Sequence, residues 1–218
     1  MKPARPKADR ICAIVPVNVL RGSKTRLAKQ LDAPSRARLS KAMLLDVLHA
    51  LLKVRRISRI TIVSADFAVR RIIAPTRVHF LWEGKRKGLN KSVRLAMRDA
   101  NRRKFSAALV VPSDIPLVTA SEITRFLRSS DRYPVAITPS KDQEGTNALL
   151  LRPPGIIEPA FGKNSFRKHV SLAKQNCLQV RVTKSAGIAS DVDDAADLAG
   201  LKRILLRNET GRFLRTVC

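Results

Sequence analysis

The chain has 218 residues, 44% of them hydrophobic, which excludes an intrinsically disordered protein and suffices for one domain with a substantial core. Lys and Arg number 43 against 17 Asp and Glu, so the formal net charge is +26. This charge occurs without a zinc-finger, RNP or basic-zipper pattern and with one Trp and one Tyr, so it predicts a basic solvated surface more strongly than a nucleic-acid partner.

Apolar runs of strand length alternate with apolar repeats of helical spacing through the first half of the chain. Strands are predicted at Ile11 to Val17, Arg59 to Ser64, Val78 to Trp82 and Ala107 to Val111, and helices from Ser35 onward and at Asp66 to Ile73, Gly88 to Asn101 and Thr119 to Arg128. In the first helix Leu39, Met43, Val47 and Leu51 recur at helical spacing after Pro34. This alternation predicts parallel strands.

The pattern changes in the second half, where two strands follow each other without a helix between them. Strands are predicted at Val135 to Pro139, Asn147 to Leu151 and Leu178 to Thr183, and helices at Ser165 to Gln175 and after Asp194. We therefore expect a single-domain, Rossmann-like α/β fold with a mixed, mostly parallel sheet flanked by helices.

Neither an internal repeat nor a low-complexity linker divides the chain. Residues 1–10 are predicted to be a basic flexible tail, and residues 11–218 one domain. The tail is a poor signal peptide, and no apolar run approaches the roughly 18 residues that span a bilayer. The cysteines lack a C-x-x-C pair, so neither a disulfide framework nor a zinc site is indicated, and a cytoplasmic protein is expected.

Asp114 follows the buried strand Ala107 to Val111. Open α/β sheets bind ligands at the carboxyl ends of their parallel strands, so Asp114 is a candidate metal ligand. A structural alternative is that Ser113 or Asp114 caps the helix that begins near Thr119, or stabilises the turn before Pro116.

Asp191, Asp193 and Asp194 form a second acidic group in this basic chain. Neighbouring carboxylates repel unless a cation or several donors lie among them. Mg²⁺ is commonly held by one or two carboxylates, water and substrate phosphates, so Asp114 and one member of this group would suffice for a magnesium site. Asp194 and Asp197 are also suited to the N-terminus of a helix, and that role alone would explain them.

The loop after the first strand contains Ser23, Lys24, Thr25 and Arg26. Backbone amides and two cations in this position can bind a triphosphate. The loop matches neither the Walker A pattern nor G-x-G-x-x-G, and solvated surface charge is the alternative interpretation.

Two further loops contain small residues that can donate hydrogen bonds to an anion. Gly145, Thr146 and Asn147 precede an apolar strand, whereas Gly162 and Ser165 lie in the segment Phe161 to Phe166 before a helix. Ser165 is equally well explained as a helix N-cap, and His169 as a packing residue or as a group that orients a ligand.

Together these segments resemble one family, the 2-phospho-L-lactate or phosphoenolpyruvate guanylyltransferases of coenzyme F-420 (deazaflavin) biosynthesis. The segments are Val15 to Leu27 with the Asp46-containing helix, Gly88 to Asn90, Pro112 to Pro116, Gly145 to Leu149 with Phe161 to His169, and Asp191 to Leu198. The resemblance covers most of the chain. It implies a nucleotidyltransferase fold similar to glycosyltransferase-A-like enzymes, and a reaction that uses GTP and Mg²⁺ to make a GMP-capped acid and pyrophosphate.

The resemblance also implies roles for individual residues. It gives Asp114 and Asp193 as metal ligands that act in catalysis with Lys24; Lys24, Arg26, Gly88, Asn90 and Asp114 as nucleotide-binding residues; and Thr146, Gly162 and Ser165 as residues that bind the acceptor acid. The family's first loop commonly reads Pro-Val-Lys, whereas this chain has Asn18 in the third position. Lys24, Arg21 and Lys29 are the candidates to replace the missing cation.

Three questions stay open at the level of the sequence. The acceptor can be phospholactate, phosphoenolpyruvate or 3-phosphoglycerate, because these differ by groups that only the shape of a pocket distinguishes. The alternative functions are a related nucleotidyltransferase acting on a sugar phosphate or molybdopterin, and a non-catalytic nucleic-acid-binding protein. The protein can be a monomer or a homodimer.

Overall fold

The structure, a computed structural model, describes residues 10–85, 88–204 and 206–217, so residues 1–9 of the expected tail lie outside the described part. The predicted alternation in the first half is confirmed, with β1 (Ile11–Pro16), α1 (Ala33–Leu52), β2 (Ile57–Ser64), α2 (Phe67–Ile73), β3 (His79–Trp82), α3 (Leu89–Arg102), β4 (Ala107–Val110) and α4 (Ala120–Ser129). The loop between β1 and α1 contains two short 3₁₀ helices, η1 (Leu20–Gly22) and η2 (Thr25–Leu27).

The second half contains more helices than the sequence predicts. Its elements are β5 (Val135–Pro139), β6 (Thr146–Leu151), α5 (Ser165–Gln175), β7 (Val180–Val182), α6 (Ala186–Ala189), α7 (Ala195–Lys202) and α8 (Glu209–Leu214). The prediction of one final helix after Asp194 is wrong, because α8 follows α7. Short helices depend on tertiary contacts: the carboxylate of Asp46 on α1 accepts the N–H groups of Glu209 and Thr210, at 2.8 and 2.9 Å, and so holds the first turn of α8.

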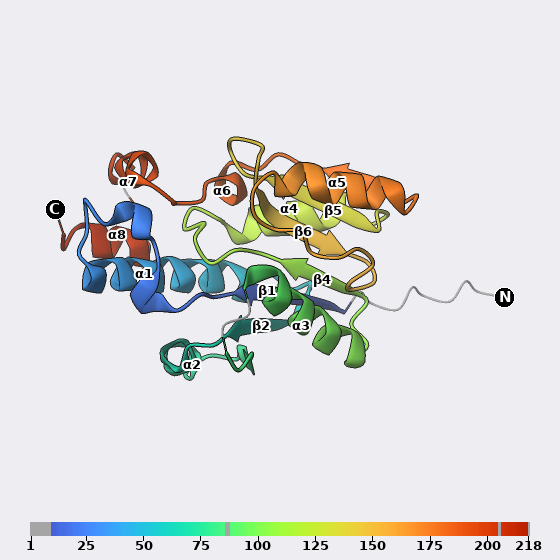
Figure 1. Cartoon of the computed structure of the whole chain (residues 1–218), viewed down its shortest axis with the longest axis horizontal. Helices are drawn as coiled ribbons and strands as arrows, with labels where there is room; N and C mark the ends of the chain where they lie inside the picture. The colour runs from blue at the N-terminus through green and yellow to red at the C-terminus, as the bar shows by residue number, and fades with distance from the viewer. Residues whose placement is uncertain (1–9, 86–87, 205, 218) are drawn as a thin grey trace.

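The seven strands of the described chain form one sheet in the order β3-β2-β1-β4-β6-β5-β7 (Figure 1). The strands β1 to β4 are parallel to one another, β6 is antiparallel to both β4 and β5, and β7 is parallel to β5. The mixed, mostly parallel sheet that the sequence predicts is thereby confirmed.

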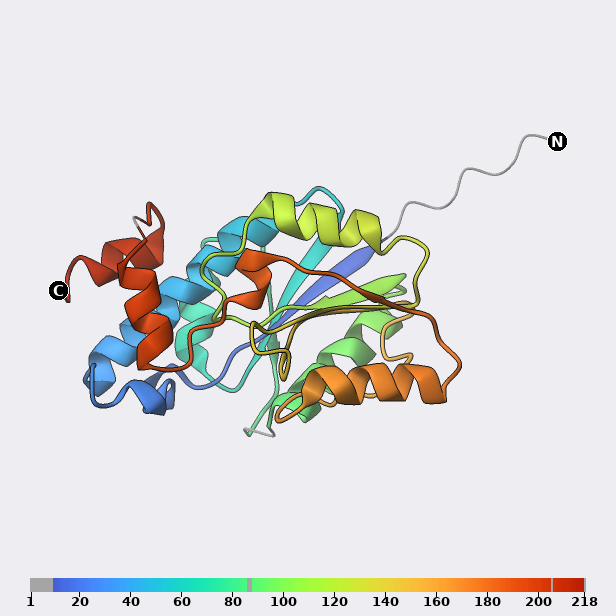
Figure 2. The same cartoon turned by 90° about the horizontal axis from the view of Figure 1, so that it is seen from above.

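Helices cover both faces of the sheet (Figure 2). Along β1, Ile11, Ala13 and Val15 pack with side chains of α1, α2, α4 and α6, whereas Cys12 and Ile14 pack with side chains of α3 and α5 on the other face. This period-two alternation of buried residues is that of a strand enclosed on both sides. None of the helices in the described ranges is long and apolar enough to cross a bilayer.

A third apolar cluster lies at the end of the molecule where α7 and α8 pack against α1 (Figure 1). It contains Leu27 of the first loop, Met43 of α1, Val192, Leu198 of α7 and Phe213 of α8, all buried. Burial of these side chains joins the C-terminal segment to the loop after β1. Residues that precede α7 are thereby brought to the edge of the sheet at which β1 and β4 end.

The reversal of β6 brings the beginning of a strand to that same edge. Val110 pairs with Leu149 and Ala108 with Leu151, so the chain of β6 runs away from the point where β4 ends. Thr146, the first residue of β6, therefore lies on the side of the sheet towards which β4 leads into Asp114. The end of β4 and the beginning of β6 can therefore contribute side chains to one site.

Candidate active site

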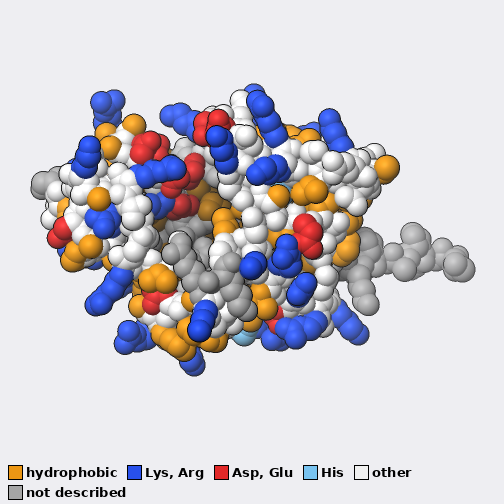
Figure 3. All heavy atoms as spheres, viewed as in Figure 1, with side chains coloured by type: hydrophobic (Ala, Val, Ile, Leu, Met, Phe, Trp, Pro, Cys, Tyr) orange, Lys and Arg blue, Asp and Glu red, His pale blue; other side chains and the backbone are white. Residues whose placement is uncertain are grey.

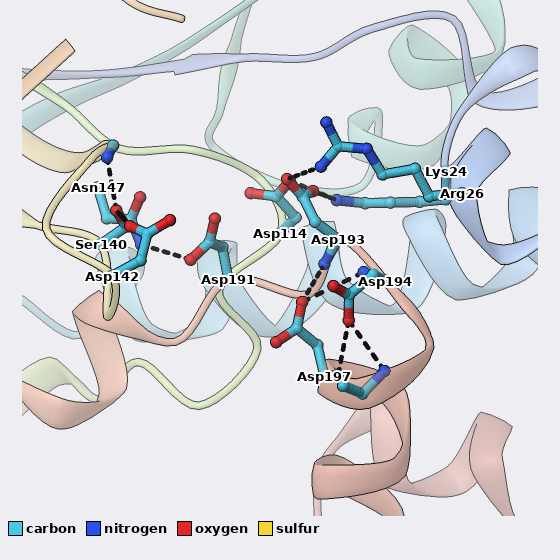
Figure 4. A network of polar contacts seen from close by, with 12 residues as sticks. Lys24, Arg26, Asp114, Ser140, Asp142, Asn147, Asp191, Asp193, Asp194 and Asp197 are labelled. Atoms are coloured by element: carbon cyan, nitrogen blue, oxygen red, sulfur yellow. Dashed lines mark hydrogen bonds and ion pairs between the residues drawn. The ribbon is translucent and has the colours of Figure 1, made fainter. Parts of the chain in front are cut away.

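Lys24, Asp114 and Asp193 come from three separate segments and meet at one point (Figure 4). The ammonium group of Lys24 donates to Asp114 Oδ2 at 2.5 Å and to Asp193 Oδ1 at 2.8 Å. Asp114 follows β4, whereas Asp193 precedes α7. The two carboxylates that the sequence predicts to share a cation are therefore close to each other and to a cation of the chain itself.

Backbone contacts fix the position of Asp193. The N–H of Val192 donates to the carbonyl of Asp114 at 3.1 Å, and the N–H of Asp193 donates to Asp197 Oδ2 at 2.9 Å. Asp194 and Asp197 form a capping box at the start of α7. Asp194 and Asp197 are thus the helix caps of this group, and the side chain of Asp193 is left to point at Lys24.

Asp114 has no comparable structural role in α4. The N-cap of that helix is Thr119, whose hydroxyl accepts the N–H of Glu122 while the Glu122 carboxylate accepts the N–H of Thr119. The structural alternative in which Ser113 or Asp114 caps this helix is therefore wrong. The carboxylate of Asp114 is available for the site.

Lys24 is held in a strained and largely enclosed position. Its backbone is left-handed, with φ 53°, and 11% of its side chain is exposed. Burial alone would lower the pKa of Lys24, but the negative charges of Asp114 and Asp193 outweigh that effect and raise it. Lys24 is therefore a permanent positive charge between the two carboxylates.

A cavity of about 500 Å³ opens at this point. Its lining includes Asn18, Lys24, Arg26, Asp114 and Asp193. Figure 3 shows carboxylates gathered in a hollow of a surface that otherwise carries many Lys and Arg side chains. The arrangement can hold a polyanion through its cations, and a metal ion through its carboxylates.

Arg26 extends this cavity towards solvent. Its Nη1 lies 3.7 Å from Asp193 Oδ2, and its side chain is 75% exposed. Such an exposed ion pair contributes little to stability, so the guanidinium is free to turn to a phosphate. Of the candidates to replace the cation missing at Asn18, Lys24 lines the cavity, whereas Arg21 and Lys29 are exposed and are not in its lining within the described residues.

The carboxylates fit a divalent cation that takes part of its coordination from a substrate. The described part of the chain contains no group of three or more His, Cys, Asp or Glu residues that would hold a metal by themselves. Asp114 and Asp193 supply two hard oxygen donors around one point, where Lys24 now lies. Water and phosphate oxygens would complete such a site, as is usual for Mg²⁺.

Asp191 links the segment that contains Asp193 to the start of β6. Its Oδ1 accepts a hydrogen bond from the amide of Asn147 at 3.1 Å (Figure 4). Burial raises the pKa of Asp191, the bond from Asn147 opposes that shift, and the charge of Asp114 adds to it. The hydrogen bond from Asn147 to Asp191 thus connects the strand that begins at Thr146 with the segment that contains Asp193.

The predicted acceptor-binding residues lie together around His169. Ser165 Oγ is 3.3 Å from Thr146 Oγ1, and the N–H of Ser165 donates to the carbonyl of Gly162 at 3.0 Å. His169 Nδ1 is 3.0 Å from Thr146 Oγ1. Ser165 is not the N-cap of α5, because Asn164 has that position. Within the described residues, the lining of the 500 Å³ cavity does not include Thr146, Gly162 or Ser165.

The hydrogen bonds of His169 define its protonation. Burial lowers its pKa to about 4, so the ring is neutral near pH 7. Nε2 accepts the N–H of Ala160 at 2.9 Å, which leaves the proton on Nδ1 to be donated to Thr146 Oγ1. Because Thr146 also receives a bond from Ser165, its own hydroxyl proton is left to be donated elsewhere.

Gly88 and Asn90 lie at the start of α3, where the sequence predicts a helix to begin. Gly88 has φ 85°, a conformation that favours glycine, and is the N-cap of the helix. The amide of Asn90 donates to the carbonyl of Phe161 at 3.1 Å and accepts the N–H of Phe161 at 2.7 Å. Asn90 therefore ties the start of α3 to the loop that contains Gly162.

Two features of the site are absent from the sequence-based predictions. One is the pairing of Asn90 with Phe161, and the other is Glu83, a buried carboxylate directly after β3. The signal that could have found Glu83 is its position, because it follows a strand in a chain that is poor in acidic residues.

Comparison with known proteins finds relatives over most of the chain. Residues 11–217 match the family described as "Guanylyl transferase CofC like". The phosphoenolpyruvate guanylyltransferase of Sphaerobacter thermophilus is 37% identical over 190 residues, which cover 87% of this chain and 91% of that protein. The 2-phospho-L-lactate guanylyltransferase of Methanothermobacter thermautotrophicus is 35% identical over 198 residues, with 91% and 85% covered.

Solved structures share the fold at low sequence identity. A candidate nucleotide-diphospho-sugar transferase from Desulfovibrio desulfuricans superposes with a TM-score of 0.79 at 20% identity, and covers 95% of each chain. A nucleotidyl transferase from Methanothermobacter gives a TM-score of 0.67 at 15% identity, with 95% of this chain and 99% of that one covered. A Mycobacterium tuberculosis protein solved as a complex with manganese gives 0.61 at 16% identity, with 91% and 100% covered.

The fold is thus that of nucleotidyltransferases similar to glycosyltransferase-A-like enzymes, and the match to the family extends over nearly the whole described chain. Both of these relatives exceed 30% identity and are named as guanylyltransferases. The chain belongs to the family of CofC-like guanylyl transferases, which are nucleotidyltransferase enzymes.

Proposed function

We propose that this protein transfers GMP from GTP to a small phosphorylated three-carbon acid, with Mg²⁺ and with release of pyrophosphate, in coenzyme F-420 biosynthesis. The observation that carries the proposal is the meeting of Asp114 and Asp193 at Lys24. Relatives named for phosphoenolpyruvate and for 2-phospho-L-lactate support the class of acceptor.

The reaction joins two anions. An oxygen of the acceptor phosphate attacks the α-phosphorus of GTP, a new P–O–P bond forms, and the bond from the α-phosphorus to the β-phosphate oxygen breaks. The electron pair of that bond leaves with pyrophosphate. No general base is needed, because the attacking phosphate is already ionised near pH 7. The protein must chiefly neutralise charge and align the reactants.

Each residue of the cavity has a part in this neutralisation. Lys24 and Arg26 would bind the triphosphate and stabilise the charge that develops on pyrophosphate. Asp114 and Asp193 would hold the metal ion, which when bound screens the phosphate oxygens from each other. Loss of one cationic donor in such a site costs on the order of 3 kcal/mol of transition-state stabilisation, or roughly a hundredfold in rate.

The acceptor would bind on the side of β6. The hydroxyl proton of Thr146 is available to be donated to a ligand. Gly162 has φ 113°, and, apart from its two chain neighbours, no heavy atom of the described chain lies within 4 Å of the position that a Cβ would take there. Together with Ser165 these groups are suited to the carboxylate or the phosphate of a small acid. The bond from Asn147 to Asp191 joins this side of the site to the metal-binding segment.

The test is a pyrophosphate-release assay with GTP, MgCl₂ and each of phosphoenolpyruvate, 2-phospho-L-lactate and 3-phosphoglycerate, with the products identified by ³¹P NMR. We expect pyrophosphate only when GTP, metal and one of the acids are all present, and its loss in Asp114→Asn. A panel with sugar phosphates and molybdopterin is run in parallel. Turnover with a sugar phosphate or molybdopterin alone, or none with any three-carbon acid, would overturn the proposal.

A further inference from the structure

A second cavity, of about 260 Å³, adjoins the first at the carboxyl ends of β1, β2 and β3. Its lining includes Pro16, Val63, Glu83, Gly88 and Ser92. Asn18 and Asp114 line both cavities, so the two lie side by side. A ligand whose phosphates lie beside Lys24 can therefore extend its other end into the smaller cavity.

Among the described residues that line the smaller cavity, Glu83 is the charged one apart from Asp114 at the junction. It is 6% exposed, and its N–H donates to the carbonyl of Ser64 at 3.3 Å, so its backbone continues the pairing of β3 with β2. The hydroxyl of Ser92 donates to Oε2 of Glu83. Across the described ranges, Glu83 Oε1 receives no hydrogen bond.

A buried carboxylate with an unused oxygen requires hydrogen-bond donors, because desolvation of the charge is otherwise unfavourable. Ser92 supplies one donor, and the described chain supplies no other to the side chain. Each carboxylate oxygen can accept more than one hydrogen bond, so Oε2 can also receive a second donor. Oε1 is not among the fully buried atoms that lack a partner, so it opens to the cavity, where water or a ligand can donate to it.

We propose that Glu83 recognises the guanine base of the donor nucleotide, by accepting the N1–H on one carboxylate oxygen and the 2-amino group on the other. This inference rests on the proposed guanylyl transfer and adds the residue that selects the base. The space suits a two-ring base, since a cavity of about 150 Å³ holds a benzene ring. Val17 and Leu89, which also line the cavity, supply apolar surface for the faces of the rings.

The carboxylate distinguishes guanine from the other bases because it only accepts hydrogen bonds. Guanine presents two adjacent donors, N1–H and the 2-amino group, on its Watson–Crick edge. Adenine presents the N1 acceptor there, cytosine presents acceptors at N3 and O2, and uracil flanks its single N–H with two carbonyl oxygens. A site that is built to bond particular donors rejects analogues without them by large factors, because its own groups are then left unpaired.

The substitution Glu83→Gln tests the inference, because it should reverse the preference of the protein between GDP and XDP. The glutamine keeps one acceptor for N1–H and replaces the other oxygen by an NH₂ donor, which matches the 2-carbonyl of xanthine instead of the 2-amino group of guanine. We measure binding of GDP, IDP, XDP and ADP by calorimetry in MgCl₂. Glu158→Gln is the control, because that side chain is 64% exposed and pairs with Arg94 on the surface.

The wild-type protein and the control variant should bind GDP about tenfold more tightly than IDP, which lacks one donor, and roughly a hundredfold more tightly than XDP or ADP. In Glu83→Gln the preference between GDP and XDP should reverse. Unchanged preference in that variant, or an equal loss of GDP and XDP binding in a folded protein, would overturn the inference. Thermal unfolding of each variant shows whether it is folded.

The wild-type protein tests the inference even if Glu83→Gln fails to fold. Equal affinity for GDP, IDP and ADP would refute recognition of the base. Failure of the two proposals can be told apart: guanine-selective binding without transfer to any three-carbon acid contradicts the proposed function alone. Transfer that proceeds equally with GTP and ITP contradicts the role of Glu83 alone.

Discussion

Lys24 and Asp193 are 169 positions apart in the sequence, yet Lys24 Nζ lies 2.8 Å from Asp193 Oδ1. The same ammonium group is 2.5 Å from Asp114 Oδ2. Two carboxylates at this separation would repel if they faced each other without a cation. Lys24 therefore compensates the charge of the two carboxylates that we propose as metal ligands.

Lys24→Ala should make the stability of the protein depend on metal. Without the ammonium group the two carboxylates repel, and since Asp193 is 48% exposed the loss is expected to be only about 1 kcal/mol. MgCl₂ should restore that loss, because the ion binds the folded state alone. The melting temperature is followed through a MgCl₂ titration, with Lys29→Ala, an exposed lysine of the same loop, as the control. An equal response in the two variants would contradict this prediction.

Asp193→Asn and Asp194→Ala should affect different properties. The first removes a charge from the site and should lower kcat/KM of guanylyl transfer by roughly a hundredfold, with little change in the free energy of unfolding. The second removes the N-cap of α7, so it should reduce the free energy of unfolding by about 1 kcal/mol while transfer is largely retained. Urea denaturation and steady-state kinetics of both variants check this. A reversed assignment of the two effects would show that the wrong aspartate has been placed in the site.

His169 should contribute a pH dependence to stability. Its pKa is about 4 in the folded protein against an ordinary value of 6.5, because it is buried. Between these values the unfolded chain binds a proton that the folded chain does not, so the free energy of unfolding should decrease as the pH falls from 6.5 towards 4. The decrease from this residue is about 3 kcal/mol at most. Urea denaturation across the window should give a flatter profile for His169→Gln than for His49→Gln, an exposed histidine on α1; parallel profiles would rule the contribution out.

Asn90→Leu should weaken binding of the acceptor acid more than binding of GTP. The substitution removes both hydrogen bonds to Phe161, each contributing about 1 kcal/mol, and so releases the loop that contains Gly162. The KM of the acceptor should rise about tenfold. Asn101→Leu is the matched control, because Asn101 donates to the carbonyl of Pro154 at the other end of α3. A rise confined to the KM of GTP would instead indicate that Asn90 contacts the nucleotide directly.

The parts of the fold that periodicity determines could be predicted from the sequence. β1 and β4 are buried almost throughout, β2 is buried from Ile60 to Ser64, and α1 has a buried stripe at helical spacing. Asp114 could be identified because it lies in the loop that follows β4. The residue pattern narrowed the second carboxylate to a group of three aspartates, and the family resemblance singled out Asp193. The capping box of α7, in which Asp194 takes part, gives the physical reason that Asp194 has a different role. The hydrophobic pattern along the sequence thus predicts the helices and strands, and it narrows the list of candidate site residues.

The remaining contacts join residues far apart in the sequence, and no local pattern encodes them. The pairing of Asn90 with Phe161 and the bond from His169 to Thr146 each require the folded loop after β6. α8 could not be predicted because six residues make a marginal helix, and the buried carboxylate of Asp46 on another helix holds its first turn. Such features follow from tertiary structure and become visible only with it.

The reversed direction of β6 has a consequence for how the substrate range of this enzyme can change. The parallel strands β1 to β4 lead into Asn18, Glu83 and Asp114, whereas the side that carries Thr146 is built by a hairpin that runs the opposite way. Substitutions in the hairpin leave the parallel strands and their loops in place. With the acceptor beside Thr146, as we propose, a lineage of such proteins can exchange one small acid for another while the loops after the parallel strands stay the same.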